Sequence, residues 1–420
     1  MNNFLFESRI EFNKKFFLNI FSFLVYLLPL ALISGPFFSD LIVSIVGLYF
    51  IILTFKDDLR DYYKNKFVYI FCFFYLCIFL SSILSIDPLF SFESSFFYFR
   101  FLFFSLAICY FINNKENFIR IFTYGTIIAL LILLIDGFIQ FFYGSNIFQF
   151  KPIPGRIGSL FGDKYVLGHY VVRMMPLLFA LFSLKKDINK TELSFFFIFF
   201  IGLSLLVLIS GDRSALLLLL IEITLFLLLL KKFRSFMVTY AAVALLSIFF
   251  AIIVSPEIKD RIISKTINQL IINNQIVLFS DYHERMFNTG FSMFKEKPLI
   301  GQGPKLFRVL CIEDRFYVEG GGCSTHPHNT YIQLLAETGI FGTIIVISIF
   351  LSLTYLMLKQ FLSINFKYMN FKIEDSSICL IIAIFICLWP ITPTLNFFNN
   401  WISILHFLPV GFLLSKKITV

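Results

Sequence analysis

Charged residues are scarce in this sequence. Asp, Glu, Lys and Arg together make up 15% of the 420 residues, whereas hydrophobic residues make up 58%. A soluble domain of this length needs a largely polar surface, so the scarcity of charge excludes a soluble protein and predicts an integral membrane protein. Phenylalanine alone occurs 61 times, and we interpret this excess as apolar bulk that faces lipid.

A removable signal peptide is also missing. The first residues show no basic segment followed by a short apolar run and a small-residue cleavage site, so the first apolar stretch is predicted to be an uncleaved anchor. A window of about 20 residues finds about twelve stretches that could each span a membrane as a helix. They lie near residues 16–34, 37–55, 67–86, 96–112, 118–142, 165–184, 193–210, 214–230, 236–255, 330–358, 376–393 and 398–414. The predicted fold is an all-α polytopic membrane protein.

Basic residues are distributed unevenly along the chain. If the N-terminus is cytoplasmic, the segments that then lie inside hold about 20 Lys and Arg residues, whereas the short outside loops around 35, 90 and 395 hold none. This pattern follows the positive-inside rule and predicts that both termini are cytoplasmic. The formal net charge of +9 follows largely from this bias, so we do not interpret it as a sign of nucleic-acid binding.

Polar residues concentrate in the middle of the chain. Residues 1–143 and 346–420 are predicted to be transmembrane helices, and the motifs lie within 144–345. That region includes one sizeable segment outside the membrane, 256–329, whose residues 260–279 have the apolar spacing of a surface helix.

The stretch from His326 to Gly342 joins this polar segment to an apolar span. Pro327 suits the first turn of a helix, which would place His328 and Asn329 in the opening turn. The free backbone N–H groups of such a terminus favour an anion such as phosphate. Gly339 and Gly342 would give the same helix a small flank for close packing in the membrane.

Four motifs in this region resemble the signature of the bacterial O-antigen ligase and polymerase superfamily. They are His328-Asn329 followed after nine residues by Gly339-x-x-Gly342-Thr343; the loop from Arg156 to Gly162; the turn Ser210-Gly211-Asp212-Arg213; and Arg285 followed by Pro298-x-x-Gly301-x-Gly303. The second motif departs from the family pattern, because Gly162-Asp163-Lys164 stands where Pro-Asn is usual.

The resemblance implies an enzyme of the bacterial inner membrane with its site on the periplasmic face. Such enzymes move a glycan from a polyprenyl-diphosphate carrier to an acceptor hydroxyl, without cofactor or metal. By this resemblance Arg156, Arg213 and Arg285 bind the diphosphate and His328 assists the acceptor, with His326 as its competitor. Neutral histidine suits a general base, and arginine suits a leaving diphosphate. Possible accessory residues are Arg100, which lies within a predicted span, Asn329 and Lys164.

The acceptor is not fixed by the motifs. We favour an O-antigen ligase that uses lipid A core, on the His-Asn spacing and the single large late loop. A polymerase of O-antigen or exopolysaccharide, which uses another carrier-linked glycan, and a protein O-oligosaccharyltransferase remain alternatives. A membrane transporter is the alternative from another class, although no internal repeat supports it.

Two cysteines, Cys311 and Cys323, lie in the outer segment, where an oxidising compartment permits a disulfide. We predict that they bond, which would hold the residues up to Asn329 in place. A zinc site made of these cysteines with His326 and His328 is the alternative, but its spacing fits no common zinc pattern.

The predicted topology can be tested with reporter fusions. A reporter joined after residue 232 should be cytoplasmic, and one joined after residue 300 should be periplasmic, because the basic residues near 232 anchor that loop inside. Paired alkaline phosphatase and fluorescent protein fusions measure the side of each point. If both points lie on the same side, the topology is wrong.

Overall fold

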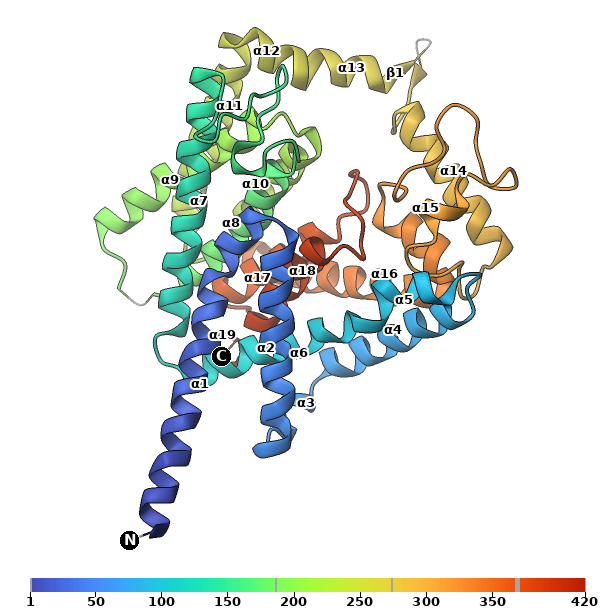
Figure 1. The fold of residues 1–420 in the computed structure, drawn as a ribbon. Helices are drawn as coiled ribbons and strands as arrows, with labels where there is room; N and C mark the ends of the chain where they lie inside the picture. Colours follow the sequence, from blue (N-terminus) through green and yellow to red (C-terminus); the bar gives the residue numbers. More distant parts are fainter. Residues whose placement is uncertain (1, 186, 273–274, 367–370, 420) are drawn as a thin grey trace.

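The computed structural model describes residues 2–185, 187–272, 275–366 and 371–419 of the chain. It is helical almost throughout (Figure 1), as the sequence predicted. The strands that it contains, β1 (Ile271–Ile272) and β2 (Gln275–Ile276), form one short antiparallel pair. Lys186 and Lys367, two basic residues assigned to the cytoplasmic side, lie outside the described residues.

Most of the helices coincide with the predicted apolar stretches. These helices are α1 (Asn2–Ser34), α2 (Pro36–Lys56), α4 (Lys66–Ile83), α5 (Pro88–Ser95) continued by η1 (Phe96–Phe99) and α6 (Arg100–Asn114), α7 (Phe118–Tyr143), α8 (Leu167–Ser183), α9 (Lys190–Ile209), α10 (Arg213–Leu229), α11 (Arg234–Val254), α16 (Thr330–Phe366), α17 (Asp375–Cys387) and α18 (Asn400–Leu413). Short helices connect them: α3 (Arg60–Tyr63), η2 (Ser159–Phe161), α12 (Pro256–Lys259), η3 (Asp260–Ser264), α13 (Lys265–Leu270), α14 (Asp281–Glu296), α15 (Phe307–Leu310) and α19 (Lys416–Thr419).

Eight segments of the described chain are long and apolar enough to cross a membrane. Helices α8, α10, α17 and α18 have fewer than 18 residues each. The count of twelve spans therefore stays a prediction. The short helices α8 and α17 lie inside the bundle, because every residue from Leu167 to Phe182 and from Asp375 to Cys387 is buried. Protein surrounds these two helices on all sides.

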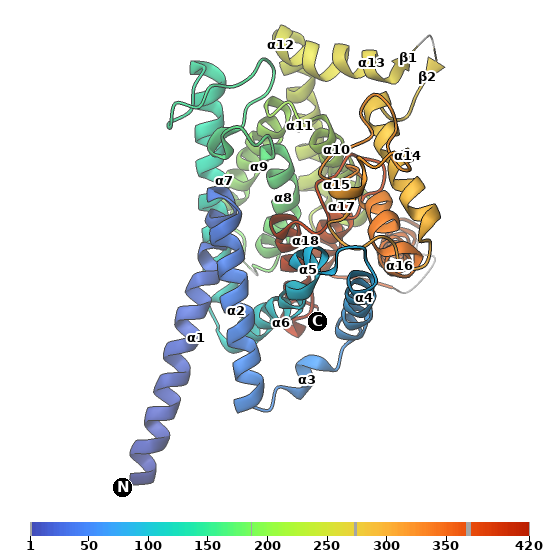
Figure 2. The ribbon, with the colours of Figure 1, turned by 45° about the vertical axis from the view of Figure 1, so that its right-hand side comes forward.

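The outer segment begins with a rod that runs across one end of the bundle, from α11 to α14 (Figures 1 and 2). It consists of α12, η3 and α13 in direct succession. The predicted surface helix over 260–279 is therefore present only as far as Leu270, where the chain turns into β1. The rod places its residues over the ends of α10 and the loop before α8.

Helix α16 breaks at Gly339, whose φ of 61° is left-handed. The loop 298–303 fills the break: the N–H groups of Ile340 and Phe341 donate to the carbonyls of Pro298 and Leu299, and two N–H groups of the loop donate back to α16. The break therefore leaves few backbone groups without partners, as a membrane requires. Gly339 packs closely, as predicted, but it does so against the loop 298–303 at a break in the helix.

Two intramembrane polar residues of α7 find their partners in the loop that carries Arg156. Asp136 accepts hydrogen bonds from the Ser159 hydroxyl at 2.6 Å and from the Ile147 N–H at 3.0 Å. Gln140 accepts from the N–H groups of Gly158 and Ser159. Because both side chains are buried, these hydrogen bonds fix the loop against the bundle.

Close backbone packing at the α16 break can be tested with two alanine substitutions. A Cβ on Gly339 would overlap the backbone of Leu299, whereas a Cβ on Gly144, which also has a left-handed φ, would meet nothing within 4 Å. Gly144→Ala should cost about 1–2 kcal/mol through its backbone angle alone. Gly339→Ala should cost roughly 2–5 kcal/mol because the overlap adds to that cost. Thermal unfolding in detergent measures both, and equal losses would contradict the packing.

Candidate functional site

Helix α16 begins later than the sequence suggested. His328 has a φ of 56°, which is left-handed, and therefore lies before the helix. Asn329 caps the helix instead, because its side-chain oxygen accepts from the N–H groups of Tyr331 and Ile332. The cap occupies the donors that were expected to bind an anion. The prediction of His328 and Asn329 in the first helical turn was wrong, and a left-handed residue at this place is rare.

His326 and His328, which precede α16, both form hydrogen bonds with Thr394 in the loop after α17. The Thr394 N–H donates to the carbonyl of His328 at 2.7 Å. The other histidine, His326, is buried, and its ring donates from Nε2 to the Thr394 carbonyl at 3.1 Å. Its Nδ1 lies 3.0 Å from the hydroxyl of Thr325. Both ring nitrogens of His326 therefore have protein partners, which leaves no lone pair for a substrate.

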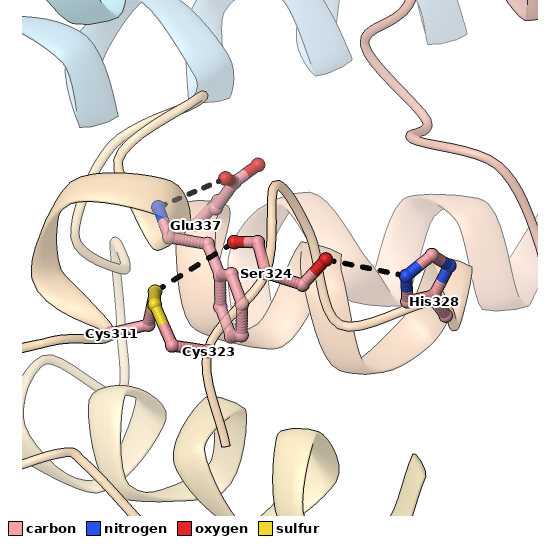
Figure 3. Close-up of a disulfide and its surroundings, with 6 residues drawn as sticks. Cys311, Cys323, Ser324, His328 and Glu337 are labelled. Carbon is pink, nitrogen blue, oxygen red and sulfur yellow. Dashed lines mark hydrogen bonds between the residues drawn. A yellow bond between two sulfur atoms is a disulfide. The ribbon is translucent and has the colours of Figure 1, made fainter. Parts of the chain in front are cut away.

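His328 is the more available of the two. Its ring centre lies 4.1 Å from that of His326, and its Nε2 is 3.4 Å from the hydroxyl of Ser324 (Figure 3). Burial, followed by the nearby His283, lowers the pKa of His328 to about 4. Burial, followed by His328, lowers the pKa of His326 to about 3. Both rings are therefore neutral at pH 7, as a general base must be.

A disulfide anchors the segment that leads to these histidines. The structure joins Cys311 and Cys323, with a Cα–Cα distance of 5.0 Å, and Ser324 follows directly (Figure 3). The zinc site considered from the sequence would need both of these thiols, and the disulfide uses them. Among the described residues, no group of three or more His, Cys, Asp or Glu side chains is placed to hold a metal ion.

A cavity of about 510 Å³ lies between the start of α10, the rod, α14 and the loop after α17. Three arginines line it, Arg156 from the loop before α8, Arg213 from the start of α10 and Arg261 from η3. His283 of α14 lines the same cavity, and its ring centre lies 5.9 Å from that of His328. The cavity thus brings three guanidinium groups together with His283, which lies next to His328.

Glycines allow the three arginine-bearing segments to touch. A Cβ on Gly211 would overlap the carbonyl of Gly155, and a Cβ on Gly155 would lie 2.9 Å from the Cβ of Arg261. Arg261 also donates from Nε to the Gly211 carbonyl at 3.0 Å. Each glycine has a positive φ, so larger residues would be strained as well as crowded.

The other two arginines are held by neutral groups. Arg213 donates to the Thr266 hydroxyl at 3.3 Å and to the Gln269 side-chain oxygen at 2.7 Å. Arg156 lies over the Tyr165 ring, 4.4 Å from its centre, and donates to the carbonyl of that residue. Neutral partners orient a guanidinium without cancelling its charge.

One carboxylate, Asp212, lines this cavity. Its oxygens lie 2.7 Å from the Ser214 hydroxyl and 3.3 Å from Nε2 of His169, a buried residue of α8. His169 in turn contacts Arg173 at 2.6 Å. Asp212 therefore faces the helix bundle with its own partners, and three cations against one anion leave the cavity positive.

Several predicted site residues lie elsewhere. Arg285 pairs with Asp281 at 2.8 Å and donates to the Glu319 carbonyl, so that it fastens α14 to the disulfide loop and does not line the cavity. Arg100 pairs with Asp40 of α2 at 2.8 Å. Lys164 is exposed and is not among the cavity residues.

Two cavity residues were not predicted from the sequence. Arg261 and His283 match none of the family motifs, and each lies in the outer segment. The signal that could have found them is their position, since a basic residue in a predicted periplasmic segment is not explained by topology.

Comparison with known families adds one finding. Residues 197–347 match the family model of the O-antigen ligase, Wzy_C. The resemblance to the O-antigen ligase and polymerase superfamily is confirmed. No curated protein matches the chain. The Wzy_C region extends from α9 into α16 and contains Arg213, Arg261, His283 and His328.

The match of residues 197–347 supports a glycan-transferring enzyme of the ligase or polymerase type, which implies a lipid-linked glycan and an acceptor as substrates. This finding favours the enzyme over the transporter weighed from the sequence. Arg156 lies outside the matched region, and the structure brings it to the same cavity as Arg213.

Proposed function

We propose that this protein transfers a glycan from a polyprenyl-diphosphate carrier to an acceptor hydroxyl at the periplasmic face of the inner membrane. The preferred acceptor is lipid A core, which makes the enzyme an O-antigen ligase. The observation that carries the proposal is the cavity lined by Arg156, Arg213, Arg261 and His283. The ring centre of His283 lies 5.9 Å from that of His328, which itself does not line the cavity.

The charges of the cavity suit a diphosphate. A diphosphate that links lipid and sugar carries two negative charges, and the cavity offers three guanidinium groups against one carboxylate. Guanidinium groups bind phosphate oxygens in pairs and keep their charge when partly buried. They are fixed before the reaction, so they stabilise the charge that grows on the leaving diphosphate.

The apolar part of the cavity suits the lipid. Leu217 and Leu220 of α10, together with Leu278 and Ile391, line the cavity next to the arginines. Leu217, Leu278 and Ile391 expose much of their side chains. An isoprenoid chain that leaves the diphosphate along α10 would cover these residues and continue into the membrane.

His328 acts as the general base in this proposal. The neutral ring takes the proton of the acceptor hydroxyl while the acceptor oxygen bonds to the anomeric carbon of the donor sugar. The bond between that carbon and the phosphate oxygen breaks, and the carrier diphosphate leaves on the arginines. His326, whose nitrogens are both engaged, holds the neighbouring ring in position.

The proposal is tested by transfer assays on the reconstituted protein with a lipid-linked glycan and separate acceptors. His328→Ala should lower kcat by about 10²–10⁴-fold, the usual scale for a general base. Arg213→Ala and Arg261→Ala should weaken use of the donor, because the leaving diphosphate loses a cation. Arg285→Ala is the matched control among the outer arginines, since it does not line the cavity, and it should affect the donor less.

The pH profile gives an independent measure. Because the pKa of His328 is lowered to about 4, the base form persists far below the ordinary histidine value of about 6.5. The ratio kcat/KM should stay flat between about pH 8 and pH 5.5 and fall only as the pH approaches about 4. A fall centred near 6.5, or wild-type transfer by His328→Ala, would contradict the assignment.

Transfer to lipid A core and not to a second carrier-linked glycan or a peptide would select the ligase.

A further inference from the structure

We propose that His283 is a further donor-binding residue, which donates a hydrogen bond from Nε2 to a phosphate oxygen of the carrier. The inference rests on the proposed function, since it adds a residue to the same site. His283 belongs to none of the four motifs described above, and its position in the structure alone points to this role.

His283 is close both to the arginine-lined cavity and to the ring of His328. Its side chain lines the cavity with Arg156, Arg213 and Arg261. Its ring also stands nearly perpendicular to that of His328, at 86°, with the centres 5.9 Å apart. An anion held by the arginines would therefore share the cavity with His283, on the side where His328 lies.

A single hydroxyl fixes the orientation of this ring. The Ser280 oxygen lies 2.6 Å from Nδ1 of His283. Ser280 is the N-cap residue of α14, a place where serine usually bonds to the helix backbone, yet its side chain makes no such bond here. The hydroxyl is used for the ring instead. When it donates to Nδ1, the proton of the neutral imidazole is on Nε2.

The environment keeps this ring neutral. Burial, followed by the charge of Arg213, lowers the pKa of His283. A neutral imidazole adds no fourth positive charge to the arginines, and it offers one directed N–H group. Such a group can fix the position of one phosphate oxygen, because a hydrogen bond depends on direction more strongly than the attraction of a cation does.

A packing role is the alternative. The ring of His283 also lies near the rings of Phe287, at 6.4 Å, and Tyr282, at 5.7 Å between centres. A phenylalanine would preserve such contacts and lose only the N–H group. A glutamine would lose the ring and keep an N–H donor near the place of Nε2. The two substitutions therefore separate hydrogen bonding from packing.

The experiment measures binding of radiolabelled polyprenyl diphosphate without a sugar to the purified full-length protein in detergent. His283→Phe should weaken binding by roughly tenfold or more, the scale for a hydrogen bond to a charged group. His283→Gln should remain within about threefold of wild type, because a donor is kept. Ser280→Ala should weaken binding by less than His283→Phe and should add little to it in the double variant.

The outcomes separate this inference from the proposed function. If Arg213→Ala abolishes binding while His283→Phe binds as wild type, the function stands and the role of His283 is overturned. If His283→Gln loses binding and His283→Phe does not, the ring packs and does not donate. If both lose equally, a retained N–H group does not restore binding. The inference fails in either case. If neither Arg213→Ala nor His283→Phe changes binding, the donor cavity itself is wrong. All variants should elute as wild type in size-exclusion chromatography, which checks that they fold.

Discussion

Repulsion between three guanidinium groups is the constraint on which the outer face of this protein depends. Arg156, Arg213 and Arg261 share one cavity with a single carboxylate, so the protein without substrate holds an excess of positive charge in a partly buried place. Like charges so close raise the free energy of the folded state. An anion removes this cost, and the site is therefore prepared for a diphosphate before it arrives.

Close backbone packing maintains this unfavourable arrangement. Gly155 and Gly211 let two loops and the rod α12–η3–α13 approach so closely that a Cβ would overlap. On the other side of the site, the loop 298–303 docks into the break of α16. The disulfide at Cys323 and the bonds of Thr394 then fix the histidines between these regions. The contacts of the two glycines and of the loop 298–303 are made by backbone, so they cannot rotate away as a surface side chain could.

The sequence was sufficient for the membrane class and for the family, because both depend on patterns that are local in the chain. Apolar runs gave the helices, and the spacing from His328 to Gly342 gave the resemblance. The sequence was not sufficient to place the start of α16. His328 has a left-handed φ, which residues other than glycine rarely adopt, and this conformation is supported by a hydrogen bond from Thr394, 66 residues away. The sequence could not separate Arg285 from Arg261 either. Both are arginines of one outer segment, and only the path of the rod brings Arg261 over Gly211.

The site therefore follows from tertiary contacts and not from motifs alone. The most direct test is a structure of the protein determined by electron cryomicroscopy in nanodiscs with bound polyprenyl diphosphate. The account predicts density for the two phosphates between Arg213 and Arg261, within hydrogen-bonding distance of both, and an isoprenoid chain along α10. Phosphate density at Arg285 with the cavity of Arg156, Arg213 and Arg261 empty would contradict it.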